Sequence, residues 1–155
     1  MIEEVDAYFQ KISQEILDSE IFQSEKRYLA HSNISVYEHS YNVAKRAYRL
    51  AKKKNLDIDY RSLIRGALLH DFYLYDWHKK GEGHRLHGFR HPFIAYKNAT
   101  KYFKINKIEG NIIKSHMFPL VFWVLPLSKE ARLVIKSDRN EAIKETFSKK
   151  EKEHL

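Results

Sequence analysis

The chain has 155 residues, enough for one domain with a hydrophobic core, and 43% of its residues are hydrophobic. It contains no cysteine, which excludes disulfides and thiolate metal ligands, and we therefore expect a cytoplasmic protein. The formal net charge of +8 favours anionic partners. No segment approaches the roughly 20 apolar residues of a membrane-spanning helix and no secretory signal is recognisable, so we expect no membrane partner.

Apolar residues at helical spacing predict the first two long helices. The first helix has a stripe made of Val5, Phe9, Ile12 and Ile16. A link from about residue 23 to 35 leads to a helix over about 36 to 54. The apolar stripe of this second helix contains His39, which we therefore expect to point inward.

A third helix is predicted from about 60 to 73 by the stripe Leu63, Ile64, Ala67, Leu68 and Asp71. His70 lies beside this stripe. Adjacent helical residues diverge by about 100°, so His70 and Asp71 could hold one ion only if this end of the helix lies against the site.

Three later segments place further polar groups on inward faces. His91 precedes Pro92, a favoured first helical residue, so we expect His91 at a helix N-terminus. His116 continues the stripe of Ile108, Ile112 and Ile113, and Pro119 ends that helix. Ser128 can cap the last long helix, whose inward face includes Asp138. Between the last two helices, the apolar stretch 117–127 contains two prolines and predicts a loop or short helix that walls the core or a pocket.

Buried histidines and aspartates are costly to desolvate, and metal ions are the best compensation when several of them converge from separate helices. Each residue also has a simpler interpretation. A histidine on an apolar stripe can be a hydrogen-bonded core residue, and His91 can cap a helix. Asp138 can form a surface ion pair with Lys136 or Arg139. The occurrence of all six groups on inward faces favours a metal site.

The order of these residues resembles the motif of the HD-domain superfamily of metal-dependent phosphohydrolases, in its binuclear form with two extra histidines. The resemblance covers about 30 to 145, and the strings at 37–40, 68–71 and 87–92 are similar to those of small bacterial members. It implies an all-α, single-domain helical bundle over residues 1–155, with catalytic residues His70 and Asp71. It also implies six metal ligands: His39, His70, Asp71, His91, His116 and Asp138.

In that family pattern one ion is held by His39, His70, Asp71 and Asp138, and the second by His91 and His116, with Asp71 bridging. Imidazole and carboxylate donors suit Fe²⁺ or Mn²⁺, which binuclear members favour, while Zn²⁺, Ni²⁺, Co²⁺ and Mg²⁺ remain alternatives. Two such ions activate a water for attack on phosphorus. Two better-known branches of the family have motifs that this chain lacks: Ile-Gly-Lys and Gly-Tyr-Pro in the cyclic-dinucleotide phosphodiesterases, and a Glu-Asp pair in the alarmone hydrolases. The substrates of these two branches are therefore disfavoured.

Basic residues close in sequence to the ligands predict capture of an anionic phosphorylated small molecule, such as a nucleotide. They are Lys79, Lys80, Arg85, Arg90, Lys114 and Arg139. The segment 74–90 is rich in Gly and polar residues and predicts a loop at the rim of the site, where His78, His84 and His87 are either solvated or in contact with substrate.

The sequence leaves three functions open. The one we favour is hydrolysis of a phosphate ester or anhydride. The second is a di-iron oxygenase acting on a small diol or phosphonate, since a few HD-domain proteins use the same ligands. The third is a basic nucleic-acid-binding module with a structural metal, although no recognition motif accompanies the charge. The substrate and the oligomeric state are not predictable.

Overall fold

The computed structural model describes residues 6–79 and 86–153, which form seven α-helices and one 3-10 helix. The helices are α1 (Ala7–Leu17), α2 (Glu20–Gln23), the 3-10 helix η1 (Ser24–Arg27), α3 (Val36–Lys53), α4 (Tyr60–Leu69), α5 (His87–Tyr102), α6 (Lys107–Ser115) and α7 (Lys129–Glu153). Within the described ranges there is no strand beyond an isolated bridge between Leu29 and Ser35. The all-α prediction is confirmed.

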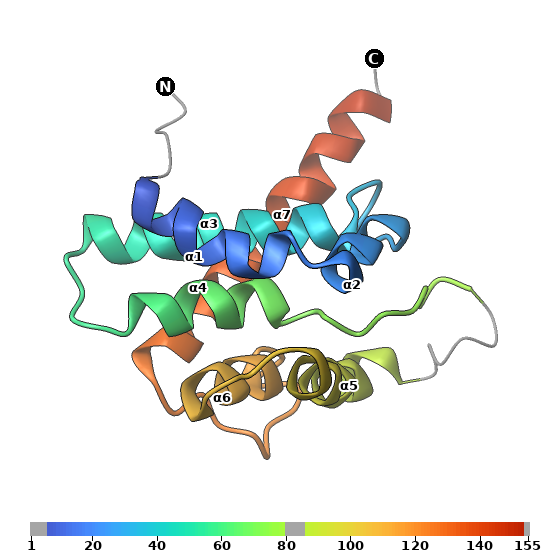
Figure 1. Cartoon of the computed structure of the whole chain (residues 1–155). Coiled ribbons are helices and arrows are strands. Elements are labelled where there is room, and N and C mark those ends of the chain that lie inside the picture. The colour runs from blue at the N-terminus through green and yellow to red at the C-terminus, as the bar shows by residue number, and fades with distance from the viewer. Residues whose placement is uncertain (1–5, 80–85, 154–155) are drawn as a thin grey trace.

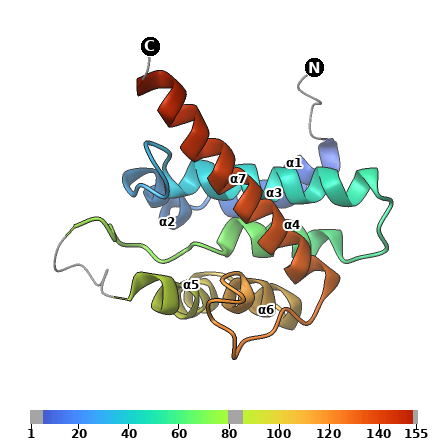
Figure 2. The ribbon, with the colours of Figure 1, turned by 180° about the vertical axis from the view of Figure 1, so that it is seen from behind.

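Helix α4 is the centre of the bundle. It packs against α3 and α1 on one side, α6 on the other and α7 behind, and every residue from Ser62 to Leu69 is buried. Figure 1 shows α1 and α3 above α4, with α5 and α6 below it. Figure 2 shows α7 running diagonally across the back of these layers, with its last turns protruding beyond α3. Elements from both ends of the chain therefore meet around α4.

Side-chain caps fix where several helices begin. The side chain of Ser35 accepts a hydrogen bond from the Glu38 N–H at the start of α3, and Asp59 does the same for Ser62 at the start of α4. At α6, Asn106 and Glu109 form a reciprocal capping box. Such caps satisfy backbone donors that have no partner within the helix. They fix the residue at which each of these helices begins.

Helix α4 is shorter than predicted and α5 is longer. α4 ends at Leu69, so His70 and Asp71 follow the helix instead of lying on it. The prediction that His91 begins α5 is wrong, because α5 begins at His87 and Pro92 lies inside it. The extra turn is held by the Leu86 carbonyl, which accepts from the N–H groups of Phe89 and Arg90. The proline rule considers only local backbone bonding and misses this support.

Among the described residues, no helix is both long enough and apolar enough to cross a lipid bilayer. The hydrophobic core instead collects one face from each long helix, from Phe9 of α1 to Val134 of α7. A smaller cluster of Ala30, Val36 and Tyr73 lies beside it, with Tyr28, Tyr75 and Trp77 packed around it. Aromatic residues of the loop after α4 are thus anchored against the segment that precedes α3.

The contact between α4 and α6 yields a stability prediction. A Cβ atom at Gly66 would lie 2.6 Å from Cδ1 and 3.0 Å from Cβ of Ile112. We expect Gly66→Val to destabilise the fold by about 1–3 kcal/mol, because overpacking outweighs the small gain in helix propensity. Chemical denaturation measures the change. Ile112→Ala should recover part of the loss in the double variant, and strictly additive effects would contradict direct contact as the cause.

Candidate metal centre

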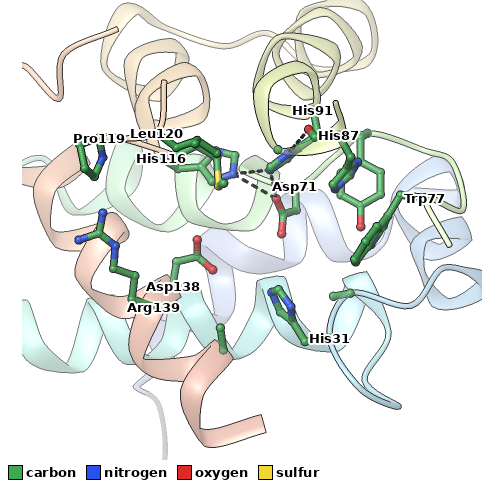
Figure 3. Close-up of a pocket in the computed structure, with 15 residues that line it drawn as sticks. His31, Asp71, Trp77, His87, His91, His116, Pro119, Leu120, Asp138 and Arg139 are labelled. Atoms are coloured by element: carbon green, nitrogen blue, oxygen red, sulfur yellow. Dashed lines mark hydrogen bonds and ion pairs between the residues drawn. The ribbon is translucent and has the colours of Figure 1, made fainter. Parts of the chain in front are cut away.

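Six polar residues from five parts of the fold converge beneath a cavity. Figure 3 shows the four that line the cavity: Asp71, His91, His116 and Asp138. The six residues come from α3, the residues after α4, the second turn of α5, the end of α6 and the middle of α7. Five are buried and the sixth, Asp138, is half-buried. Their donor atoms form three overlapping groups, each within 4.8 Å: His39, His70 and Asp71; His70, His116 and Asp138; and Asp71, His91 and His116. The structure therefore brings together all six residues that the sequence singled out.

The carboxylate of Asp71 stands between two pairs of histidines. Its Oδ1 lies 3.2 Å from Nε2 of His91 and 3.2 Å from Nε2 of His116. Its Oδ2 lies 3.2 Å from Nε2 of His70 and 3.7 Å from Nε2 of His39. A carboxylate whose two oxygens face separate donor pairs has the arrangement needed to bridge two cations.

Asp138 lies against the pair formed by His70 and His39. Its Oδ1 lies 2.9 Å from Nε2 of His39 and 3.5 Å from Nε2 of His70. His39, His70, Asp71 and Asp138 thus form one half of the cluster, and His91 and His116 form the other. This division is the one that the resemblance implies.

The other ring nitrogen of each histidine is held by an acceptor. Nδ1 donates to a backbone carbonyl in three of them: His70 to Ala67 at 2.6 Å, His91 to His87 at 2.8 Å, and His116 to Ile113 at 2.7 Å. A carbonyl accepts only, so the proton of each ring lies on Nδ1 and the Nε2 lone pair faces the cluster. Metal-ligating histidines are oriented in the same way.

Two features of the cluster are difficult to explain without a cation. Nε2 of His91 lies 2.8 Å from Nε2 of His116, although each ring has its proton on the opposite nitrogen. Two lone pairs facing each other repel, whereas neighbouring ligands of one ion lie about 3 Å apart when each bond is about 2.1 Å. Nε2 of His70 is also buried without a hydrogen-bond partner. The residues therefore fit divalent metal ions.

The carboxylates of the cluster remain ionised at neutral pH. Burial alone would raise the pKa of Asp71, but the neighbouring rings of His70, His116 and His91, each with Nε2 at 3.2 Å from one of its oxygens, hold it well below its usual range. The pKa of Asp138 is lowered in the same way, because His70 and His39 outweigh the effect of burial. The centre thus offers anionic oxygen donors over the whole physiological range.

The histidines of the two halves differ in basicity. Burial lowers the pKa of His39, but hydrogen bonds to Asp138 and Glu145 more than offset it and raise the pKa to about 10. Burial lowers the pKa of His116, and the nearby Asp71 does not fully offset it. A cation held by His39, His70, Asp71 and Asp138 must therefore compete with a proton on His39.

Glu145, which the sequence interpretation missed, orients His39. Both of its carboxylate oxygens lie 3.0 Å from Nδ1 of His39, and the side chain is buried. Glu145 lies seven residues after Asp138 and so occupies the same face of α7, which is the signal that could have found it. Glu25 of η1 was missed as well. Its carboxyl is buried, and burial together with the charge of Asp71 raises its pKa well above the usual range.

A cavity of about 640 Å³ lies over the cluster. Its walls include three further ring side chains, His31, Trp77 and His87, and an apolar side formed by Met117, Pro119 and Leu120. Figure 3 shows His31 and Trp77 across the opening from His116 and Leu120. His31 was not singled out by the sequence. It comes from the link before α3, and its ring packs edge-on against His39 with centroids 5.0 Å apart.

A stack of aromatic rings connects the loop after α4 to the cluster. Trp77 stacks on His87 at a centroid distance of 4.9 Å, and His87 stacks on His91 at 4.4 Å. The hydroxyl of Tyr75 lies 2.7 Å from Nδ1 of His87. Burial and then the neighbouring His91 lower the pKa of His87 to about 3, so His87 is neutral at physiological pH. This stack links one wall of the cavity to the cluster.

Among the residues predicted to bind substrate, Arg139 lines the cavity, and its guanidinium donates to the carbonyl of Phe118. Arg90 and Lys79 are exposed and do not line the cavity. Lys114 lies over the ring of Tyr96 at 4.5 Å from its centroid. Lys80 and Arg85 fall outside the described residues, as does His84, while His78 packs on Trp77 at the surface.

Comparison with protein families gives a match to the HD domain over residues 36–143. The matched segment contains all six residues of the cluster. The chain belongs to the HD-domain family. Comparisons with curated proteins and with solved structures give no match. The chain is thus an HD-domain protein with a buried His/Asp cluster that could hold metal ions, which is consistent with the sequence resemblance.

The contact between Glu145 and His39 yields a second prediction. Glu145→Ala should weaken metal binding by about 10- to 100-fold, because the His39 ring loses the acceptor that fixes its orientation and tautomer. Titration of the metal-free protein with Mn²⁺ measures the affinity. Glu141→Ala is the matched control, since Glu141 is a buried carboxylate on the same helix that pairs with Arg46. Equal losses in the two variants would contradict a specific role for Glu145.

Proposed function

We propose that the protein is a metal-dependent phosphohydrolase that cleaves a phosphate ester or anhydride at a two-metal centre. The observation that carries this proposal is the position of Asp71, whose two oxygens face two separate histidine pairs in a chain of the HD family. In the proposed arrangement His39, His70, Asp71 and Asp138 hold one ion, and His91 and His116 hold the other together with Asp71. Imidazole and carboxylate donors favour Fe²⁺ or Mn²⁺.

Bound ions of this kind supply an activated water and stabilise negative charge on phosphoryl oxygens. The protein side chains perform the positioning. The carbonyls of Ala67, His87 and Ile113 keep three rings aimed at the centre, and Glu145 does so for His39. The carboxylates of Asp71 and Asp138 stay ionised. No cysteine is present to act as a nucleophile.

The cavity supports a small phosphorylated substrate, and a nucleotide is the class we propose. Its volume of about 640 Å³ falls within the usual range for small-molecule sites. Arg139 lies on the wall beside Asp138, where its planar guanidinium can hold two phosphate oxygens. His31, Trp77 and His87 line the same space and offer ring surfaces for a base or another planar group.

The role of Asp71 gives the central test of the two-metal proposal. Asp71→Ala should abolish turnover and release both metals, because the bridging carboxylate is lost. His91→Ala or His116→Ala should release mainly one metal, since the other half keeps His39, His70 and Asp138. Elemental analysis of anaerobically purified protein measures the stoichiometry, and a panel of phosphate esters and anhydrides with added Mn²⁺ or Fe²⁺ measures turnover.

Circular dichroism spectra show whether each variant is folded. An Asp71→Ala protein that is folded, holds two metals and turns over normally would refute the assignment. Unchanged stoichiometry in both histidine variants would indicate a mononuclear enzyme. Oxygen consumption with a mixed-valent iron signal, and no hydrolysis across the panel, would favour the oxygenase.

Capture of the phosphate gives a separate prediction for Arg139. Arg139→Ala should leave the metal content intact and lower kcat/KM by about ten- to a thousandfold, or ~1.4 to 4 kcal/mol, with partial rescue by Lys. Arg90→Ala should have a smaller effect, because Arg90 is exposed and does not line the cavity. Lys136→Ala on the exposed face of α7 is the control. Wild-type kinetics in Arg139→Ala would move the search to Arg90, Lys79, Lys80, Arg85 and Lys114.

A further inference from the structure

The segment between α6 and α7 presents large apolar side chains to solvent. Five of its residues are 43–75% exposed, and two exposed residues at the start of α5 accompany them. We call these seven residues the apolar tip: Leu86, Phe89, Leu120, Phe122, Trp123, Leu125 and Leu127. Figures 1 and 2 show the α6–α7 loop projecting below the α5–α6 layer, on the side away from both termini. An exposed apolar cluster of this kind marks an interaction surface.

Hydrogen bonds hold the loop in this projecting shape. The Asn111 side chain donates to the carbonyl of Leu125 at 2.9 Å and accepts from the N–H of Leu127 at 3.0 Å. Arg132 donates to the carbonyl of Pro126, and Val121 is fully buried as an anchor. The ring of Trp123 lies parallel to that of Phe89, at a centroid distance of 6.4 Å. The apolar side chains are therefore exposed on a fixed backbone.

The excess positive charge of the protein is concentrated in the same part of the chain. Residues 86–140 contain ten Lys and Arg and three Asp and Glu, a formal net charge of +7 out of the +8 of the whole chain. Nine of the ten basic residues are exposed: Arg90, Lys97, Lys101, Lys104, Lys107, Lys129, Arg132, Lys136 and Arg139.

None of the three acidic residues offsets this charge at the surface. Glu109 is buried and pairs with Arg65, and Glu130 is buried and accepts from the N–H of Asp59. Asp138 belongs to the metal cluster. The segment that carries the apolar tip thus exposes nine basic side chains, and no acidic side chain of the segment is exposed.

We propose that this part of the protein docks on an anionic lipid bilayer, with the apolar tip inserted at the interface and exposed lysines and arginines of the same segment against the headgroups. Aromatic and leucine side chains flanked by basic residues are what interfacial binding requires. The positive charge disfavours a second copy of the chain as the partner, because pairing two such faces would bring like charges together. Nucleic acid matches the charge but not the leucines of the tip, which offer no ring for base stacking.

The sequence-based expectation of no membrane partner considered only spanning segments, and interfacial docking needs none. The wall of the cavity continues into this face, since Leu120 belongs both to the cavity and to the apolar tip. Docking would therefore place the mouth of the site beside the lipid surface. The proposal concerns a surface other than the metal centre and stands independently of the reaction.

Sedimentation with vesicles tests the proposal on the full chain with no substrate present. We expect binding to vesicles with about one-third phosphatidylglycerol, little binding to phosphatidylcholine alone, and weakening with salt. The variant Phe122→Ser/Trp123→Ser/Leu125→Ser should lower partitioning about tenfold or more. Ile143→Ser/Phe147→Ser is the matched control, because both residues are exposed apolar residues on α7, outside the tip, and it should bind like the wild type.

Metal content and circular dichroism establish that each variant is folded, so failure here is distinguishable from failure of the proposed reaction. Absence of binding to anionic vesicles overturns the proposal. Equal losses in the tip and control variants overturn it as well. A dimer that the tip variant dissociates, without vesicle binding, would assign the face to a second copy. Salt-sensitive binding to DNA or RNA without vesicle binding would assign it to nucleic acid.

Discussion

The fold is organised around one electrostatic requirement: the carboxylate of Asp71 must stay ionised while buried between four imidazoles. A buried carboxylate is stable only when cations or hydrogen-bond donors surround it, and here the four histidines come from four parts of the fold: α3, the residues after α4, α5 and the end of α6. The bundle provides this because α4 ends at Leu69 and releases Asp71 from the helix at the centre of the structure. Had α4 continued, His70 and Asp71 would diverge by about 100°, and both could face the cluster only if that end of the helix lay against it.

Backbone carbonyls orient three of the four histidine rings of the cluster, and a side-chain carboxylate orients the fourth. The carbonyls of Ala67, His87 and Ile113 each lie three or four residues before the histidine they orient. Each helix therefore fixes both the position of a ring and its tautomer, without help from another element. His39 differs, because its acceptor, Glu145, comes from α7. The half of the cluster that contains His39 depends on the packing of α3 against α7, whereas His91 and His116 are oriented within α5 and α6.

The sequence predicted much of this arrangement because helical periodicity reports which face a residue occupies. His39, Asp71, His116 and Asp138 were identified in that way. His70 lies beside such a stripe, His91 was identified by its position before Pro92, and the resemblance supplied the division into two halves. Periodicity does not report what lies opposite a face. Glu145 shares its face of α7 with Asp138, yet only the α3–α7 contact shows that it meets His39. His31 belongs to a link with no periodic pattern, and the first turn of α5 is held by a carbonyl and stacked rings that a proline rule does not include.

The distribution of charge over the surface was the property that was least predictable from the sequence. A net charge of +8 spread over the surface would indicate little beyond solubility, and the lysines at 52–54 and 149–152 do lie outside the segment that holds most of the excess. Between residues 86 and 140, however, the acidic partners are all used inside the fold: Glu109 caps α6 and pairs with Arg65, Glu130 holds the turn before α4, and Asp138 faces the cluster. Folding thus removes the negative groups of this segment from the surface and leaves the positive ones exposed. Capping, core ion pairing and the His/Asp cluster each place an acidic residue inside the fold, and the exposed charge of this segment is therefore positive.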